Sequence, residues 1–315
     1  MLSNSQKLIL RIASIFALLL IATVLFACSS GGNKSTTDGT ASPAKLDVVA
    51  TTVQITALAK EVGGDRISLH GIIPAGADPH DFEPVASDLV AIENASLILR
   101  HGIGLDDWLD GTLKAGAKAR VVTVTDGIAL RQLEEDGKEI SDPHVWHDPD
   151  NAKTMVDDIN AALDMADPAG KATYDANATA YKQKLDQTKA QVQAIINEIP
   201  AGSSKLVTNH DAFGYFANAF GLTIVGAVIP ALSTEAEPSA KDTAALLDTI
   251  KRENVKAIFA ESSVNPKLAT QLAQDAHVKI VDDLYGDSLG EPGSGADTLD
   301  GMLLSNAHKI ADALK

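Results

Sequence analysis

The longest regular pattern of apolar positions along the chain runs from Pro168 to Ile199. Apolar residues recur there at steps of three, four and seven, the spacing of one face of an α-helix. The pattern begins after Asp167, a good N-cap, and Pro168 suits the first helical position. Pro200 ends it, because the residue before a proline is disfavoured in the α conformation. We predict one helix of about 48 Å at the α-helical rise. The apolar stripe consists of Tyr174, Ala178, Tyr181, Leu185, Val192, Ile195, Ile196 and Ile199.

On both sides of this helix, short apolar runs with strand character alternate with helical patterns. Such alternation is typical of mainly parallel sheets covered by helices on both faces. Before the long helix, strands are predicted at 46–52, 67–73, 97–101 and 120–123, and helices at 53–62, 87–94 and 105–115. After it, strands are predicted at 205–209, 222–228, 256–260 and 278–282, and helices at 213–220, 240–253, 266–275 and 297–313.

The position of the long helix sets the predicted domain organisation. It separates two halves of similar length, which favours a rigid joining helix over an ordinary long helix packed on one domain. We therefore predict an α/β fold of two parallel-sheet lobes joined by one long rigid helix, with a binding site at the lobe interface. The expected boundaries are 44–166 for the N-terminal lobe, 167–200 for the helix and 201–315 for the C-terminal lobe.

Residues 1–27 have the pattern of a signal peptide. Lys7 and Arg11 give this segment a positive start, and the apolar stretch 12–27 follows them. A helix that spans a bilayer needs about 20 apolar residues, so this stretch is typical of a signal-peptide core. We therefore expect residues 1–27 to be removed and to take no part in the fold.

Cys28 directly follows this segment and is the only cysteine in the sequence. Residues 25–28, with the sequence LFAC, resemble a bacterial lipobox, so Cys28 is expected to carry a lipid anchor. The alternative is a plain secreted protein with an unrelated cysteine. Residues 28–43 are rich in Ser, Thr and Gly and are expected to form a flexible tether. No cysteine is left for a disulfide or a thiolate ligand.

The charge balance narrows the classes of partner. The formal net charge is −16, and the predicted signal peptide carries cations but no anions, so the mature chain is still more acidic. An acidic surface argues against nucleic acid, which needs basic patches, and against anionic lipid beyond the anchor. It suits a protein that attracts cations. The sequence contains no phosphate-binding glycine loop, no dinucleotide fingerprint, no H-E-x-x-H and no G-x-S-x-G.

Four polar residues follow predicted strands or stand in proline-fixed turns. Open α/β sheets place ligands at the carboxyl ends of their strands, so these residues are candidates for a binding site. Two come from each predicted lobe, which indicates a shared cleft. They are His80, His144, His210 and Asp287.

Other polar residues have weaker claims. His147 lies three residues after His144 and is an alternative to it, and His101 ends a predicted strand in the same half. The carboxylates of 134–136 and of Glu235 and Glu237 are expected in solvated turns. We interpret the remaining histidines as structural or surface residues: His70, His277 and His308.

Three imidazoles and one carboxylate form a nitrogen-rich set without sulfur. Such a set suits Zn(II), or Mn(II) if the carboxylate is bidentate. In a transport site all four positions come from the protein, whereas a zinc hydrolase keeps one position open for water. Both classes remain open from the residues alone. Because free histidine titrates at about pH 6.5, metal affinity is expected to decrease as the pH drops below about 6.

Several motifs resemble those of the metal-binding lipoproteins that serve zinc and manganese ABC transporters, the cluster A-I solute-binding proteins. The resemblance covers the chain from Leu46 onward. The matching segments are DPHDFEP at 78–84, DPHVW at 142–146, NHDAFGYF at 209–216, TEAEPS at 234–239, ESS at 261–263 and GDSL at 286–289.

The resemblance implies two α/β lobes joined by one long helix, with the metal at their interface. It implies ligand roles for His80, His144, His210 and Asp287, and it favours His144 over His147 because the family's ligand precedes the Val-Trp pair. Members with glutamate at the position of His210 look like manganese carriers, whereas histidine goes with zinc or with both metals.

These resemblances give the expected function. The protein is expected to be an extracytoplasmic solute-binding protein, lipid-anchored to the bacterial cell membrane, and not an enzyme. It is expected to capture Zn(II), or else Mn(II), and to deliver it to an ABC transporter permease. A surface adhesin, a label sometimes attached to this family, is a weaker alternative. We expect the protein to be a monomer.

Overall fold

The structure of the protein is a computed structural model, which describes residues 44–114, 118–135 and 137–315. The predicted signal peptide and the whole predicted tether, including Cys28, lie outside these residues. Within the described part of the chain, no helix combines the length and the apolar character that crossing a membrane requires.

The N-terminal lobe is built around a four-stranded parallel sheet with the order β2-β1-β3-β4. Val48 faces one side of this sheet, toward α2 and α5, while its neighbour Val49 faces the other, toward Ile92 of α3. Both faces are therefore covered by helices, as the alternating pattern predicted. The strands are β1 (Leu46–Ala50), β2 (Ile67–Gly71), β3 (Leu97–Arg100) and β4 (Arg120–Thr123). The helices are α2 (Val53–Gly63), the 3₁₀ turn η1 (Gly64–Arg66), α3 (Ala86–Asn94), α4 (Trp108–Lys114) and α5 (Pro149–Ala166).

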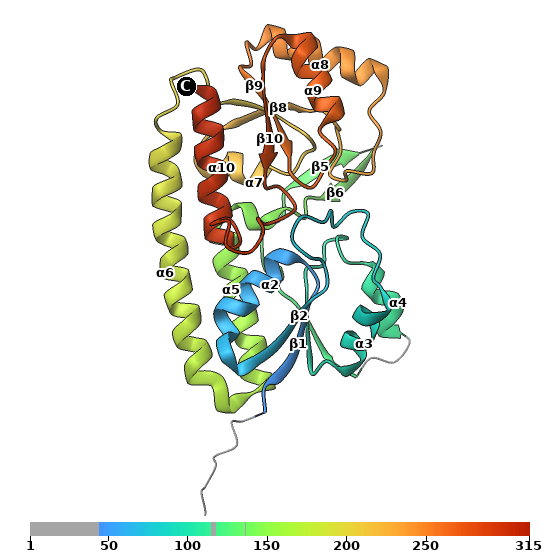
Figure 1. Ribbon diagram of the computed structural model, residues 1–315, viewed down its shortest axis with the longest axis vertical. Helices are drawn as coiled ribbons and strands as arrows, with labels where there is room; N and C mark the ends of the chain where they lie inside the picture. The colour runs from blue at the N-terminus through green and yellow to red at the C-terminus, as the bar shows by residue number, and fades with distance from the viewer. Residues whose placement is uncertain (1–43, 115–117, 136) are drawn as a thin grey trace, which may run out of the picture. The chain divides into compact units, whose positions relative to one another are not determined.

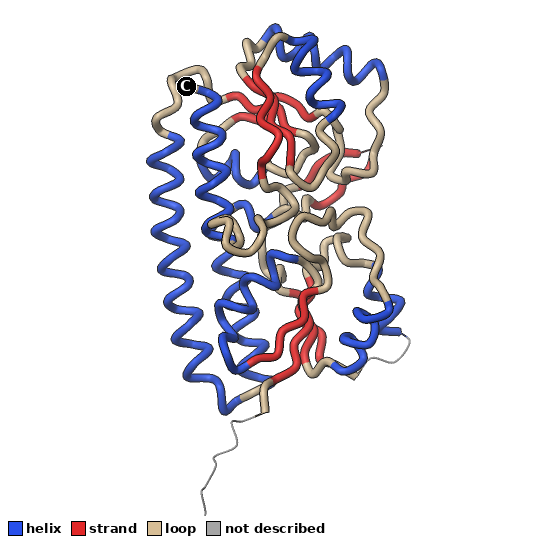
Figure 2. Tube along the Cα trace, in the orientation of Figure 1, coloured by secondary structure: helices blue, strands red, loops and turns tan. Residues whose placement is uncertain are grey.

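The C-terminal lobe repeats this arrangement with the order β10-β9-β7-β8, again all parallel. Phe259 packs on the side of α10, and its neighbour Ile258 packs on the side of α8 and α9. Figure 2 shows the two sheets as separate groups of strands, each with helices on both sides. The strands are β7 (Lys205–Thr208), β8 (Thr223–Ala227), β9 (Ala257–Glu261) and β10 (Lys279–Leu284). The helices are α7 (Gly214–Phe220), α8 (Ala240–Arg252), α9 (Lys267–Ala276) and α10 (Leu299–Leu314).

The long helix α6 (Lys171–Ile196) runs beside both lobes, as Figure 1 shows. It packs against α5 and α2 of the N-terminal lobe and against α10 of the C-terminal lobe. The predicted fold of two parallel-sheet lobes with one long helix is thus confirmed. The lobe boundaries at 166/167 and 200/201 stay predictions.

The ends of the long helix differ from the prediction. Residues 168–170 form a 3₁₀ turn, η3 (Pro168–Gly170), before the α-helix begins. The Asp167 carboxylate does not cap the helix but accepts hydrogen bonds from Arg66 at 2.7 Å and from Tyr174 at 2.8 Å. At the other end the chain tightens into three-residue turns up to Ile199, because Pro200 follows.

Two elements were missing from the sequence-based prediction. The first is α5, whose N-cap Asp148 accepts a hydrogen bond from Asp150 N at 2.9 Å. The second is the hairpin of β5 (Gln132–Glu135) and β6 (Lys138–Ser141). Glu134 and Glu135 therefore lie in a strand, and their assignment to a solvated turn was wrong. The carboxylate of Glu135 accepts a hydrogen bond of 2.6 Å from Leu232 N of the C-terminal lobe.

Candidate metal centre

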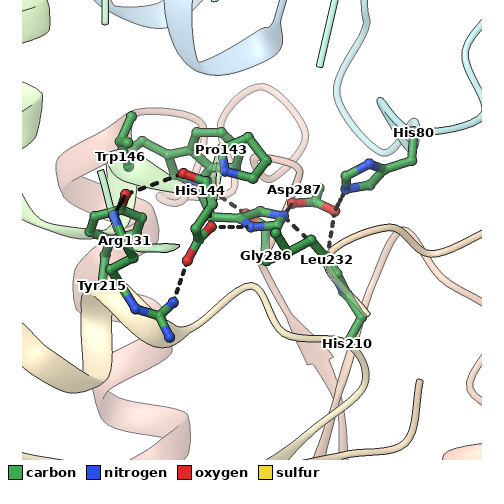
Figure 3. Close-up of polar contacts among 12 residues, drawn as sticks. His80, Arg131, Pro143, His144, Trp146, His210, Tyr215, Leu232, Gly286 and Asp287 are labelled. Carbon is green, nitrogen blue, oxygen red and sulfur yellow. Dashed lines mark hydrogen bonds and ion pairs between the residues drawn. The ribbon is translucent and has the colours of Figure 1, made fainter. Parts of the chain in front are cut away.

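The four candidate side chains from the sequence converge between the two lobes. His80, His144, His210 and Asp287 each offer one ligand atom, and these atoms all lie within 4.8 Å of one another. Figure 3 shows the imidazoles turned toward the Asp287 carboxylate. The side chains of His144, His210 and Asp287 are fully buried, while that of His80 is 9% exposed.

Loops at strand ends position these residues. His210 comes two residues after β7, Asp287 three residues after β10, and His144 just before the 3₁₀ turn η2 (Val145–His147). His80 lies in the loop between β2 and α3, where its backbone N–H donates to Asp78 Oδ1 at 2.9 Å. The other oxygen of Asp78 accepts a 2.7 Å hydrogen bond from Thr234 of the C-terminal lobe. The loop of His80 is therefore attached to the opposite lobe next to the site.

The Asp287 carboxylate lies at the middle of the group. Its Oδ2 is 3.3 Å from Nε2 of His80 and 3.1 Å from Nε2 of His210, and its Oδ1 is 3.2 Å from Nε2 of His144. Apart from these imidazoles, neither buried oxygen has a hydrogen-bond partner among the described residues. Buried polar atoms without partners usually have an unseen one, such as an ion. The residues present therefore fit a bound cation.

Two further carboxylates orient two of the imidazoles. Nδ1 of His144 is 2.8 Å from Asp142 Oδ1, and Nδ1 of His210 is 2.6 Å from Glu261 Oε1. Metal-ligating histidines commonly donate their second ring nitrogen in this way, which leaves the lone pair of the first for the metal. Gly286 lies directly against Glu261, since a Cβ at Gly286 would overlap the Glu261 carboxylate.

Backbone hydrogen bonds hold the Asp287 segment from both sides. The Gln54 side chain donates to the carbonyl of Asp287 at 2.8 Å, and the indole N–H of Trp146 donates to the carbonyl of Gly286 at 3.1 Å. Both donors belong to the N-terminal lobe. The site is thus assembled by contacts that cross from one lobe to the other.

The electrostatics of the group favour protonated imidazoles when no metal is bound. Burial disfavours the charged form of His144, but the Asp287 and Asp142 carboxylates outweigh burial and raise its pKa to about 9. Burial acts in the same way on His210, whose pKa is nevertheless raised well above its usual range by Glu261 and Asp287. Burial also opposes ionisation of Asp287, but the two imidazoles hold its pKa well below the usual value. A metal ion must therefore displace protons to bind.

The two alternative histidines lie outside the group of four. His147 is buried, and its ring centroid is 4.8 Å from that of Phe213; burial lowers its pKa to about 3. His101 is also buried, and burial lowers its pKa to about 4. Its Nε2 lies 2.8 Å from the carbonyl of Pro143, so a neutral His101 donates to the segment that carries His144. Nε2 of His70, a partly exposed side chain outside this group, lies 3.2 Å from Oδ1 of the buried Asp88.

Sequence reasoning singled out the four convergent residues but gave no role to Asp142 or Glu261. Asp142 stands two residues before His144, a short spacing that is visible in the sequence. Glu261 lies 51 residues from His210, so no local spacing could connect the two.

Comparisons with known proteins agree with this geometry. Residues 48–313 match the family described as "ZnuA: Zinc-uptake complex component A periplasmic". The chain belongs to this family. Curated relatives of this ZnuA-family protein are substrate-binding lipoproteins of metal ABC transporters, which are binding proteins and not enzymes. The predicted family, its class of function and the absence of an enzymatic role are confirmed, and the hydrolase alternative is not retained.

Individual relatives carry different metals in their names. The manganese ABC transporter substrate-binding lipoprotein PsaA of Streptococcus pneumoniae serotype 4 is 33% identical, over 96% of this chain and 99% of its own. The iron ABC transporter substrate-binding lipoprotein MtsA of Streptococcus pyogenes serotype M1 is also 33% identical, over 96% of this chain and 98% of its own. The structure of the periplasmic zinc binding protein TroA of Treponema pallidum superposes with a TM-score of 0.80 at 32% identity, covering 86% of this chain and 99% of TroA.

Proposed function

We propose that this ZnuA-family protein captures a divalent transition metal, with Zn(II) preferred over Mn(II), and delivers it to the permease of an ABC transporter. The proposed ligands are His80, His144, His210 and Asp287. The observation that carries the proposal is the placement of three imidazole Nε2 atoms within 3.3 Å of one buried carboxylate.

The names of the relatives do not decide the metal, because they include manganese, iron and zinc alike. The proposed preference for Zn(II) therefore rests on the donor atoms. Zn(II) accepts a tetrahedral set of three nitrogens and one oxygen. Mn(II) stands at the weak end of the divalent series and prefers more oxygen ligands. Both oxygens of Asp287 face the imidazoles, so a bidentate carboxylate would still allow Mn(II) to bind, more weakly.

The proposed function is tested by titrating metal-stripped protein with Zn(II) and Mn(II). A metal that binds only the folded state adds RT ln(1 + [L]/Kd), about 4 kcal/mol at a thousandfold excess over Kd. Each metal should therefore raise the melting temperature, Zn(II) more at equal concentration, and a chelator should reverse the effect. If neither metal changed the melting temperature, the proposed metal site would be wrong.

The raised pKa values predict a pH window for metal binding. Since the imidazoles hold protons in the metal-free site, affinity should rise with pH toward about 9, by about tenfold per pH unit for each displaced proton. This window lies above the one expected from free histidine. The stability of the metal-free protein should change in the opposite direction. A histidine whose pKa is raised in the folded state makes its full contribution to the free energy of unfolding below about pH 6.5. That contribution is lost as the pH rises through about 9.

Competition titrations and metal-free melts between pH 6 and 8.5 measure both trends. Zn(II) affinity that stays constant over this range would contradict proton displacement. A control with His308, an exposed histidine within α10, replaced by Ala should leave both curves unchanged.

We further propose that Cys28 is lipidated and tethers the protein outside the cytoplasm near its permease, and that the protein acts as a monomer. Relatives named as lipoproteins support the anchor. Cys28→Ala should appear in the medium or remain unprocessed, because the lipid is added to this thiol. Membrane fractionation of the native host measures the distribution, and wild-type retention of the variant would refute lipidation at Cys28.

A further inference from the structure

The base of the β5–β6 hairpin lies next to the His144 ligand. Arg131 and Asp142 face each other one step beyond the paired residues Gln132 and Ser141, and Asp142 N donates to Arg131 O at 2.9 Å. The guanidinium of Arg131 forms an ion pair with Asp142 Oδ2. The other oxygen, Oδ1, accepts from the backbone N–H of His144 at 2.9 Å and lies 2.8 Å from its Nδ1. One buried carboxylate thus joins the arginine to the metal ligand.

The C-terminal lobe holds Arg131 in this position. The backbone N–H of Arg131 donates to the Tyr215 hydroxyl at 2.9 Å, and that hydroxyl donates to the Asp142 carbonyl at 3.2 Å. The guanidinium carbon lies 5.6 Å from the centroid of the Tyr215 ring. It also rests on Gly214 at the start of α7, where a Cβ would overlap the guanidinium. Figure 3 shows Arg131 and Tyr215 together on the side of His144 that faces away from Asp287.

The two buried carboxylates that orient imidazoles differ in whether a cation contacts their second oxygen. Asp142 has a cation on the oxygen that does not face its histidine. The corresponding Oε2 of Glu261 packs against Gly286 and has no hydrogen-bond partner among the described residues. A carboxylate bound at one oxygen can rotate about its terminal bond, whereas an arginine on the second oxygen fixes its plane.

We propose that Arg131 is a positioning residue of the metal centre, which acts on the metal only through Asp142 and His144. By fixing the Asp142 carboxylate, it keeps Nδ1–H of His144 donating and the Nε2 lone pair directed at the metal. This inference rests on the proposed function, since it assigns a role at the same site.

Arg131→Met removes the guanidinium and keeps most of the aliphatic stem. Residues that hydrogen-bond the ligating side chains typically contribute about 10- to 100-fold to metal affinity. We therefore expect Zn(II) to bind to Arg131→Met about tenfold more weakly than to the wild type. Arg131→Lys, which keeps the charge but loses the planar fork, should lie between this variant and the wild type. It carries the same test if Arg131→Met does not fold. The probe is Zn(II) alone, titrated by competition into metal-stripped protein.

A double-mutant cycle separates this role from a merely structural one. Asp142→Asn should itself weaken Zn(II), and adding Arg131→Met to it should cost little more, because the path through Asp142 is already broken. Glu261→Gln is the matched control. The loss of Zn(II) affinity caused by Glu261→Gln should add to the loss caused by Arg131→Met, because Glu261 orients the other imidazole.

Gly214 supplies a test that leaves Asp142 and His144 untouched. Gly214→Ala should displace the guanidinium and weaken Zn(II) about as much as Arg131→Met, roughly tenfold. In the Arg131→Met background the same alanine should have no effect on affinity, because nothing is left to displace. Gly111→Ala in α4, where a Cβ meets nothing within 4 Å, should leave Zn(II) affinity unchanged.

Several results would overturn the inference. Arg131 would be merely structural if Arg131→Met or Arg131→Lys lowered the melting temperature of metal-free protein with Zn(II) affinity unchanged. Full additivity of Arg131→Met with Asp142→Asn would exclude a path through Asp142. The proposed function fails in a different way: His144→Ala and Asp142→Asn would then leave Zn(II) binding unaffected.

Discussion

Replacing Asp287 by asparagine should remove most of the metal affinity while leaving the fold in place. Asparagine has the size of aspartate but lacks the charge, and its amide cannot accept from three imidazoles at 3.1–3.3 Å. We expect Zn(II) to bind more than about 100-fold more weakly, above the upper range for residues that only orient ligands. The measurements are competition titration of stripped protein and the rise in melting temperature caused by Zn(II).

The variant should also change the metal-free protein. The Asp287 carboxylate contributes most to raising the pKa of His144, so its loss should flatten the pH dependence of metal-free stability between about pH 6.5 and 9. Asp283→Asn is the matched control, because Asp283 is an exposed aspartate at the end of the same strand, β10. If Asp287→Asn bound Zn(II) like the control, Asp287 would not be a ligand.

Replacing His210 by glutamate should shift the metal preference. The exchange turns one nitrogen ligand into a charged oxygen, which weakens Zn(II) and suits Mn(II). In the structure, however, His210 Nδ1 faces Glu261 Oε1 at 2.6 Å, so the single variant would bury two carboxylates against each other. We therefore expect the single variant to be destabilised, since a buried charge without its partner is costly.

The double variant His210→Glu with Glu261→Gln avoids this conflict, because the glutamine amide can donate to the new carboxylate. It should recover stability and narrow the Zn/Mn affinity ratio by about tenfold or more, a differential of about 1.4 kcal/mol. Glu261→Gln alone is the control and should lower both affinities by a similar factor. If the ratio of Zn(II) to Mn(II) affinity were unchanged in the double variant, His210 would not be a metal ligand.

The sequence was most informative where a local pattern dictates the structure. The stripe from Tyr174 to Ile196 is a period-3.6 pattern bounded by prolines, so α6 was predicted with small errors at its ends. The convergence of the four candidate residues was predicted from their places after strands, because parallel strands bring their carboxyl ends to one edge. The choice of His144 over His147 needed the family resemblance, since both lie within one turn of chain.

The remainder depends on contacts that no local pattern records. The acidic residues of β5 look like a turn, and their strand is stabilised by pairing with β6 and by the bond from Glu135 to the opposite lobe. Helix α5 was overlooked although Asp148 before Pro149 repeats the start signal of Asp167 before Pro168. Arg131 stands 83 positions before Gly214, the residue on which its guanidinium rests, and the folded chain alone brings them together.

The sequence continuity of each four-stranded sheet has a consequence for how the protein is made. Strands β1 to β4 all come from residues 46–123, and β7 to β10 from residues 205–284, so neither sheet borrows a strand from the other half. Synthesis from the N-terminus therefore lets the first sheet assemble before the second exists. Asp287 emerges after the last strand of both sheets, and none of the four candidate ligands belongs to the hydrophobic cores. In zinc fingers the metal is needed for the fold to form, whereas these cores form without the ligands, so a shortage of metal should leave folded, empty protein rather than misfolded protein.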